Sequence, residues 1–354
     1  LEFSPDNTML AFIRFDESEV ASFTFPIFAG QAPHYSALET YPGAYTYKYP
    51  KAGEANSKVS VHTFDIKSKV TRKIKLPLDP DGYIPRIRFT QDAAKLAIMT
   101  LNRNQNRIDL YFADPRSTLC KLVLRDESPY YINESVFDNI MFYPQNFSFI
   151  SEKDGYSHLY WYSMGGNLVK QVTKGKFEVK RFIGWDAATN TFYFESNEES
   201  PLRTAVYKTD KKGGRIKLSE KAGTNSAIFS SNLKYFMNTY SNLQTPAVIT
   251  LNDNTGKVLK TLVTNQKLKE TLAQYQLPKK EFFTFRTSQG TELNGWMIKP
   301  ADFNESKKYP VLLYQYSGPG SQEVVDKWGI GGDRGGIGWD AYMASKGYVI
   351  VCVD

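Results

Sequence analysis

The sequence is poor in cysteine and histidine, which excludes a disulfide scaffold and disfavours a metal centre. Only two cysteines, Cys120 and Cys352, occur among 354 residues. A disulfide framework is therefore excluded, although one bridge between the two is not. Both have apolar neighbours, which favours buried thiols. The three histidines, His34, His62 and His158, are scattered and lack the Cys or carboxylate spacing of a zinc site, so we expect no metal.

Long apolar runs are also missing. No stretch of about 18 apolar residues is present, so we expect no membrane span. The first residues, Leu1 to Asp6, are neither an initiator Met nor a signal peptide, because they lack the basic and apolar regions that a signal peptide requires. We therefore expect an internal piece of a longer chain.

Positive charge is in moderate excess, with a formal net charge of +7. The densest basic runs, at 67–75, 208–217 and 257–269, are separated by acidic and apolar residues. This pattern is typical of solvated turns and of edge strands that carry lysine to discourage pairing. We expect no nucleic-acid partner, which would need a continuous basic surface.

Aromatic residues are abundant, at 14% of the chain with 23 Tyr and 23 Phe. These residue types favour the pleated surface of strands. From the start to about residue 263, apolar and aromatic alternation is broken by Asp, Asn, Gly and Pro about every 8 to 12 residues. The pattern predicts an all-β region.

A degenerate unit recurs within this region. The segment 3–12 (FSPDNTMLAF) is echoed by 89–98 (FTQDAAKLAI), and more weakly at 184–194 and 229–236. The spacing is close to one or two multiples of about 40 to 50 residues, the period of a four-stranded propeller blade. One small twisted sheet cannot bury both faces alone, whereas radially packed blades cover one another. A β-sandwich with similar turn spacing is the alternative.

The pattern changes near residue 268. Residues 269–275 predict a short helix that Pro278 ends. Strands are predicted at 282–285 and 292–298, as an antiparallel pair joined by a turn at 288–290. The apolar run 311–316 predicts a parallel strand buried on both faces.

A βαβ unit should complete the chain. Residues 339–346 predict a helix that Gly347 terminates, and 348–353 predict a second apolar strand. The sequence contains no following strand to pair with 349–353. We therefore expect an exposed edge there, and aggregation or self-pairing of the isolated chain.

Six segments stand out, in order along nearly the whole chain: 49–53 (YPKAG), 83–87 (YIPRI), 101–106 (LNRNQN), 154–160 (DGYSHLY), 308–313 (KYPVLL) and 316–322 (YSGPGSQ). Together they resemble the prolyl oligopeptidase family of serine peptidases, and its dipeptidyl peptidase IV branch in particular. The resemblance implies a partial, multi-bladed, all-β β-propeller at 1–267, a connector at 268–280, and the first part of an α/β-hydrolase catalytic domain at 281–354, truncated before the nucleophile elbow.

The same resemblance assigns candidate site residues. Tyr316, after the first parallel strand, would donate its hydroxyl to the developing oxyanion; alternatively, its hydroxyl merely caps the strand on a backbone carbonyl. Phe137 would correspond to an aromatic that lines the substrate pocket, or else is an ordinary packing residue. No G-x-S-x-G elbow occurs in the sequence, and no histidine follows Tyr316, so the serine, acid and histidine of the triad are expected beyond Asp354.

Other polar motifs have simpler interpretations. The paired glutamates that recognise a free N-terminus in relatives lie before the segment that begins here at Ser4, and neither Glu17 nor Glu19 matches them. The Glu198-Glu199 pair predicts a solvated turn, and His158 a packed or edge residue of a strand. The glycine-rich stretch 329–336 does not directly follow a strand, so we expect a loop and not a nucleotide site.

The resemblance implies a parent enzyme that releases N-terminal Xaa-Pro or Xaa-Ala dipeptides from peptides, without a cofactor. It further implies homodimerisation and, in bacteria, export to the periplasm or cell surface. This chain alone should be inactive. Two alternatives stay open: a non-catalytic propeller that binds peptides or proteins, and an oligopeptidase or acylaminoacyl peptidase of the same superfamily.

Overall fold

The computed structural model describes residues 1–28, 41–275, 277–316, 318, 320–329 and 336–354. The chain forms two compact units. One comprises residues 1–147 and 162–168, and the other comprises 148–161 and 169–354.

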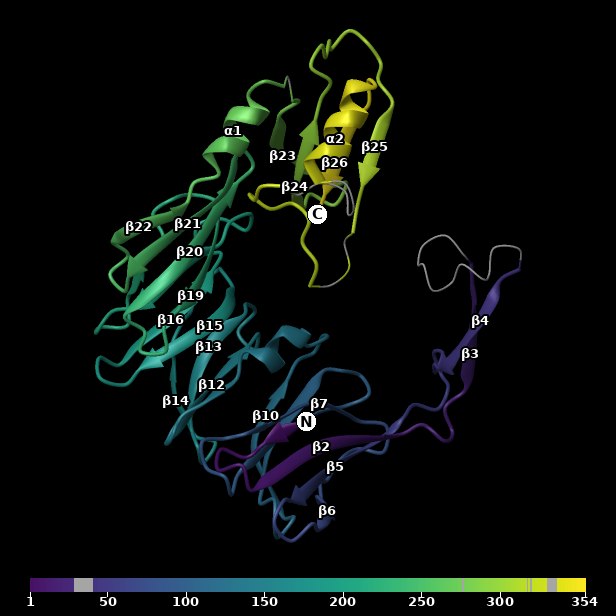
Figure 1. The fold of residues 1–354 in the computed structure, drawn as a ribbon, viewed down its shortest axis with the longest axis vertical. Helices are drawn as coiled ribbons and strands as arrows, with labels where there is room; N and C mark the ends of the chain where they lie inside the picture. Colours follow the sequence, from purple (N-terminus) through teal and green to yellow (C-terminus); the bar gives the residue numbers. More distant parts are fainter. Residues whose placement is uncertain (29–40, 276, 317, 319, 330–335) are drawn as a thin grey trace. The chain divides into compact units, whose positions relative to one another are not determined.

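Five four-stranded sheets follow one another along the chain, each hydrogen-bonded in chain order (Figure 1). In the first, second, fourth and fifth sheets all neighbouring strands are antiparallel. The strands of the five sheets are, sheet by sheet, β1 (Glu2–Phe3), β2 (Met9–Asp16), β5 (Lys58–Asp65), β6 (Thr71–Lys73); β7 (Tyr83–Phe89), β8 (Leu96–Leu101), β9 (Arg107–Ala113), β10 (Cys120–Glu127); β11 (Met141–Phe142), β12 (Asn146–Ser151), β13 (His158–Ser163), β14 (Leu168–Gln171); β15 (Val179–Asp186), β16 (Thr191–Ser196), β17 (Ala205–Thr209), β18 (Arg215–Lys217); and β19 (Thr224–Phe229), β20 (Tyr235–Asn242), β21 (Thr245–Asp253), β22 (Val258–Val263).

This series has the strand pattern of propeller blades, and it confirms the all-β prediction for this part of the chain. The first sheet carries an insertion between β2 and β5. There β3 (Ser22–Ile27) and β4 (Gly43–Lys48) pair only with each other, as a separate two-stranded sheet.

The repeated sequence unit corresponds to a repeated turn. In three sheets it closes the hairpin between the first two strands, with one backbone hydrogen bond across a six-residue segment. These bonds are Ser4 N to Met9 O at 2.9 Å, Thr90 N to Lys95 O at 3.0 Å, and Ser230 N to Tyr235 O at 2.9 Å. Hydroxyl and amide side chains of such turns satisfy backbone groups that the strands leave unpaired.

Within each unit, an apolar cluster joins two neighbouring sheets. In the first unit, one apolar cluster joins β2 and β5 to β7, β8 and β9, through residues that include Ala11, Val61, Ile87 and Leu96. In the second unit, Tyr193, Val206, Leu218, Ala227 and Phe236 join the fourth sheet to the fifth. This is the face-to-face burial that a single small sheet cannot achieve alone.

The last part of the chain is a mixed sheet in the order β23-β24-β26-β25. Its strands are β23 (Lys280–Arg286), β24 (Glu292–Ile298), β25 (Val311–Tyr314) and β26 (Val349–Val353), and it is preceded by α1 (Gln266–Leu272). Strands β25 and β26 are parallel, and α2 (Gly336–Ser345) connects them. The predicted antiparallel pair and βαβ unit are therefore confirmed. Gly347, at φ +85°, follows the helix as predicted, and α2 begins three residues earlier than predicted.

Two expectations about this sheet were wrong. Strand β26 does not form an open edge, because it lies between β24 and β25 and pairs with both. The edge strands are β23 and β25, and the apolar run of β25 is not buried on both faces, since Val311 is 61% and Leu313 58% exposed. Strand order in a sheet does not follow chain order, so the sequence could not show which strand lacks a neighbour.

Both cysteines carry free thiols. Cys352 is buried and Cys120 half-buried, and burial raises the pKa of Cys352 to about 12 and that of Cys120 to about 11. Among the described helices, none is long and apolar enough to cross a membrane.

Candidate functional site

Tyr316 follows β25 at the carboxyl end of that strand. Because β25 and β26 are parallel, their carboxyl ends share one edge of the mixed sheet, so Tyr316 and Asp354 both lie there. This edge is where open α/β sheets bind their ligands. Tyr316 is 65% exposed, so its ring is available to a bound molecule.

Among the described residues, the hydroxyl of Tyr316 makes no hydrogen bond to a backbone carbonyl, so it caps no strand there. Such a cap was the alternative to a catalytic role. The backbone of Tyr316 is held instead: Ser321 Oγ lies 3.0 Å from Tyr316 O and 2.8 Å from Gly318 O, and donates to this pair of carbonyls. The loop is thus closed on itself while the phenol faces solvent.

A half-buried carboxylate anchors the far end of this loop. Asp354 Oδ2 accepts hydrogen bonds from Glu323 N at 2.7 Å and Val324 N at 2.6 Å. The indole Nε1 of Trp296 donates to Glu323 O at 3.3 Å. Sequence reasoning missed Asp354, although an acidic residue directly after a buried apolar strand was a signal that it acts at the sheet's edge.

Phe137 lies in a short 3-10 helix, η2 (Glu134–Asp138), in the first compact unit. Phe137 is only 4% exposed. Asn133 caps the helix by accepting a hydrogen bond from Ser135 N at 2.9 Å, and Arg86 pairs with Asp138 at 2.6 Å. The ring is therefore packed, and a substrate-lining role for Phe137 stays a prediction.

His158 and His62, the two histidines among the described residues, pack against neighbouring side chains. His158 is 1% exposed, with Nδ1 3.1 Å from Thr173 Oγ1 and Nε2 3.0 Å from Gly175 O, as expected of a packed strand residue. His62 stacks on Phe12 with ring centroids 5.5 Å apart, and burial lowers its pKa. His34 lies outside the described residues. Within the described ranges, no group of three or more His, Cys, Asp or Glu side chains could hold a metal ion.

The glutamates singled out in the sequence are held by basic residues or polar neighbours. Glu198 forms a two-pronged pair with Arg215 at 2.6 and 2.7 Å, and Glu199 pairs with Lys217 at 2.7 Å. Glu19 pairs with Lys58 at 2.8 Å, and Glu17 accepts from Ser57 Oγ at 3.4 Å. Of the stretch 329–336, residues 330–335 lie outside the described part of the chain.

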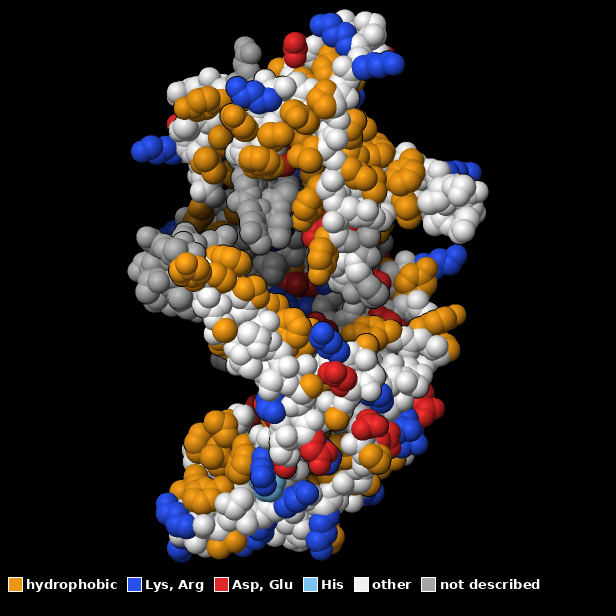
Figure 2. Space-filling model, turned by 90° about the vertical axis from the view of Figure 1, so that its right-hand side faces the viewer, with side chains coloured by type: hydrophobic (Ala, Val, Ile, Leu, Met, Phe, Trp, Pro, Cys, Tyr) orange, Lys and Arg blue, Asp and Glu red, His pale blue; other side chains and the backbone are white. Residues whose placement is uncertain are grey.

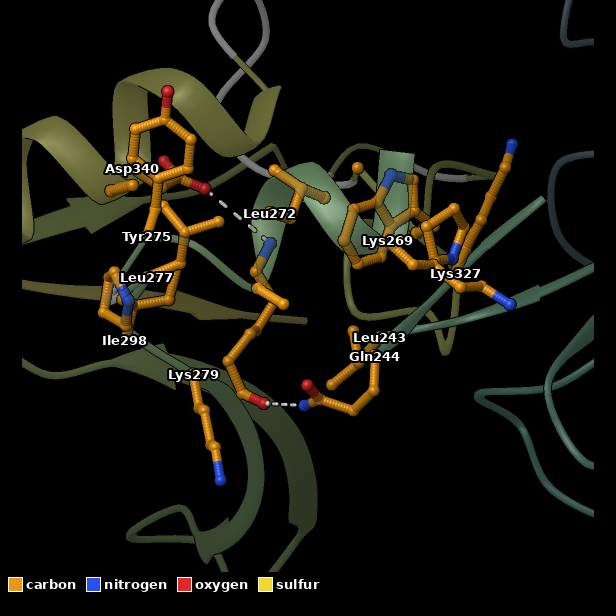
Figure 3. Close-up of a pocket in the computed structure, with 17 residues that line it drawn as sticks. Leu243, Gln244, Lys269, Leu272, Tyr275, Leu277, Lys279, Ile298, Lys327 and Asp340 are labelled. Carbon is orange, nitrogen blue, oxygen red and sulfur yellow. Dashed lines mark hydrogen bonds and ion pairs between the residues drawn. The ribbon is translucent and has the colours of Figure 1, made fainter. Parts of the chain in front are cut away.

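A separate pocket of about 350 Å³ opens beside α1 in the second unit (Figure 3). Its wall contains Lys280, whose Nζ lies 3.7 Å from Asp340 Oδ2 and whose carbonyl accepts from Gln244 Nε2 at 3.1 Å. Burial lowers the pKa of Lys280, and the charge of Asp340 opposes this. Neither Tyr316 nor Phe137 lines this pocket.

Charged side chains of both signs are mixed on the surface. On the face drawn in Figure 2, Lys and Arg lie singly or in small groups among Asp, Glu and hydrophobic side chains. The basic side chains on this face thus do not form one continuous basic surface. Counterion release from a nucleic acid would need such a surface.

Comparison with known proteins places these features in a family. The family model described as "Dipeptidyl peptidase IV (DPP IV) N-terminal region" matches residues 1–247. Dipeptidyl peptidase 4 of Trichophyton rubrum is 30% identical in an alignment of 345 positions that covers 93% of this chain and 43% of that protein.

Solved structures agree with this match. The crystal structure of Porphyromonas gingivalis dipeptidyl peptidase 4 superposes with a TM-score of 0.90 at 44% identity, covering all of this chain and 48% of that one. A putative dipeptidyl aminopeptidase IV from Bacteroides ovatus gives a TM-score of 0.84 at 27% identity, covering 99% and 51%. The chain spans about half the length of these relatives. It belongs to the dipeptidyl peptidase IV family, whose N-terminal region its first 247 residues represent.

Proposed function

We propose that this chain is part of a serine-type dipeptidyl peptidase that releases N-terminal Xaa-Pro or Xaa-Ala dipeptides from peptides. Membership in the dipeptidyl peptidase IV family supports the reaction class. The observation that carries the proposal is the exposed phenol of Tyr316 at the carboxyl end of β25, free of any strand-capping bond among the described residues.

In this proposal Tyr316 stabilises the tetrahedral intermediate. A serine attacks the scissile carbonyl, a histidine transfers the proton, and the Tyr316 hydroxyl donates a hydrogen bond to the oxygen that becomes negative. One such donor contributes about 10²- to 10³-fold to kcat. The sequence holds no G-x-S-x-G elbow and no histidine after Tyr316, so these 354 residues alone should not hydrolyse peptides.

The mixed sheet would be the first part of an α/β-hydrolase domain, at 281–354, joined by a connector at 268–280 to propeller residues 1–267. An antiparallel strand pair followed by a parallel pair with a helical crossover supports this interpretation. So does the position of the Tyr316 loop, since one part of the oxyanion hole in α/β-hydrolases comes from a loop after an early strand.

A paired activity assay tests the function. A fluorophosphonate label and a Gly-Pro chromogenic substrate are applied to this chain and to the full-length protein that contains it. We expect labelling and turnover only in the full-length protein, and a kcat lowered by about 10²-fold or more in its Tyr316→Phe variant. Hydrolysis of internal or N-acylated peptide bonds, with none of Gly-Pro, would favour the oligopeptidase or acylaminoacyl peptidase alternatives. Complete inactivity would favour a binding scaffold.

Homodimerisation and export also belong to the proposal, and both rest on the resemblance alone. Sedimentation equilibrium of the full-length protein tests the first, with a mass of twice the monomer expected. Fractionation of the source cells tests the second, with activity expected in the periplasm or at the cell surface.

A further inference from the structure

Residues 322–328, here called the strap, follow the Tyr316 loop and contact the mixed sheet and segments of the fourth and fifth sheets, here called the blade-like sheets, all in the second unit. On one side, Val324 is completely buried in an apolar cluster with Trp296, Ile350 and Cys352 of the mixed sheet. The amides of Glu323 and Val324 are fixed by Asp354. The first half of the strap is therefore part of the core of the mixed sheet.

On the other side, Asp326 is held by the blade-like sheets. Its carboxylate accepts from Arg203 Nε at 2.9 Å and from Leu243 N at 3.0 Å. Its backbone N donates to Leu202 O at 2.8 Å, and its carbonyl accepts from Thr224 Oγ1 at 2.9 Å. The side chain is only 8% exposed.

Other residues of the strap make further contacts with the same sheets. Gln322 Nε2 donates to Pro201 O at 2.8 Å, and Trp328 N approaches Ser241 Oγ at 3.4 Å. Leu202 also packs against the apolar cluster of the mixed sheet. The strap therefore ties segments before β17, at the start of β19 and around the β20–β21 turn to the mixed sheet.

The strap is continuous with the loop that carries Tyr316. Ser321, which bonds to the backbone carbonyls of Tyr316 and Gly318, directly precedes Gln322. Because the Tyr316 phenol makes no strand-capping bond among the described residues, its position depends on how this loop is held. A buried carboxylate that satisfies both an arginine and a backbone amide fixes a loop more strictly than apolar contact, since breaking either bond leaves charge poorly compensated.

We propose that Asp326 is a positioning residue for the proposed peptidase reaction: through the strap it lets the blade-like sheets set the place of the Tyr316 phenol. This inference rests on the proposed function of Tyr316. It assigns Asp326 no contact with substrate. Its loss should therefore lower kcat and leave KM nearly unchanged, because ground-state binding depends on other groups.

The test is a double-mutant cycle in the full-length enzyme with a Gly-Pro substrate. We expect Asp326→Asn to lower kcat about 10-fold, below the roughly 10²-fold that a 1 Å misplacement can cost. In a Tyr316→Phe background the same change should lower kcat less than 2-fold, since the group it positions is gone. Asp109→Asn, which breaks an Arg125–Asp109 pair of similar burial in the first compact unit, is the matched control and should leave kcat unchanged.

The outcomes separate the two proposals. If the wild-type enzyme does not cleave Gly-Pro substrates, the proposed function fails, and the inference with it. If it does, an equal loss of kcat from Asp326→Asn in both backgrounds, or no loss in either, overturns the positioning role alone. Arg203→Gln removes only the ion pair and serves as the second variant should Asp326→Asn not fold. It should show the same dependence on Tyr316.

Discussion

The ammonium of Lys280 lies 3.7 Å from the carboxylate of Asp340, with side chains that are 12% and 2% exposed. The same ammonium lies 3.9 Å from the centre of the Trp296 ring. A buried pair of this kind is costly to break from one side, because the remaining charge loses its compensation. The pair joins the first strand of the mixed sheet to α2, beside the pocket of Figure 3.

We expect Lys280→Met to lower the free energy of unfolding by about 3 to 5 kcal/mol, measured by urea denaturation. The double variant Lys280→Met/Asp340→Leu should recover most of that loss, since replacing both charges by apolar groups is often neutral. A double variant no more stable than the single one would show that the pair is not the source of the effect.

The same lysine should give the stability a characteristic pH dependence. Burial lowers the pKa of Lys280 in the folded state from 10.5. Between the lowered value and 10.5 the unfolded chain binds more protons at this position than the folded one, so the contribution of Lys280 to the free energy of unfolding rises with pH. The stability difference, wild type minus Lys280→Met, should therefore increase across that window. A decrease in this stability difference with rising pH would mean that folding raises the pKa of Lys280 instead of lowering it.

His158 should matter for stability and not for catalysis. Replacing it by alanine leaves Thr173 Oγ1 and Gly175 O without their ring partner and opens a cavity, which should cost about 2 to 4 kcal/mol in chemical denaturation. The half-exposed His62 is the matched control, and His62→Ala should cost less. A large loss of kcat in a folded His158→Ala enzyme would contradict a purely structural role.

Two turn glycines form a matched pair. Gly213 has φ +86° and Gly256 has φ +95°, but a Cβ on Gly213 would meet nothing within 4 Å, whereas one on Gly256 would lie 2.7 Å from Leu218 O. Gly213→Ala should lower the free energy of unfolding by only about 1 to 2 kcal/mol, which is the penalty for an L-residue in the left-handed backbone conformation. Gly256→Ala should cost clearly more in the same thermal unfolding experiment, and equal losses would contradict the steric argument.

The open edge of β25 in the mixed sheet should govern self-association of this 354-residue chain. Val311 and Leu313 of β25 are exposed on one face, while Leu312 packs against the apolar cluster. Leu313→Lys should raise the monomer fraction in sedimentation velocity without lowering stability, because a lysine on an edge strand discourages pairing. Leu312→Lys is the control and should destabilise the fold. Unchanged association in Leu313→Lys would place the contact elsewhere.

Much of the architecture followed from local pattern. The recurrence of the segments at residues 3, 89 and 229 predicted repeated strand pairs, because turn chemistry at Ser4, Thr90 and Ser230 is decided by neighbours in sequence. The helix before Gly347 and the parallel strands that flank it were readable for the same reason. The motif 316–322 located Tyr316. Because Tyr316 follows an apolar strand, the sequence also placed it at the carboxyl end of that strand.

What the sequence determined alone is therefore what neighbouring residues decide: strand and turn alternation, the change of pattern near residue 268, and the tyrosine after the first parallel strand. The tertiary structure decided which strands lie at the edges of the mixed sheet and that Phe137 is buried. It also decided that Asp326 and Asp354 hold the strap from two sides. Those contacts join residues 30 to 123 positions apart in the chain. Only the packing of sheets against one another brings such residues within hydrogen-bonding distance.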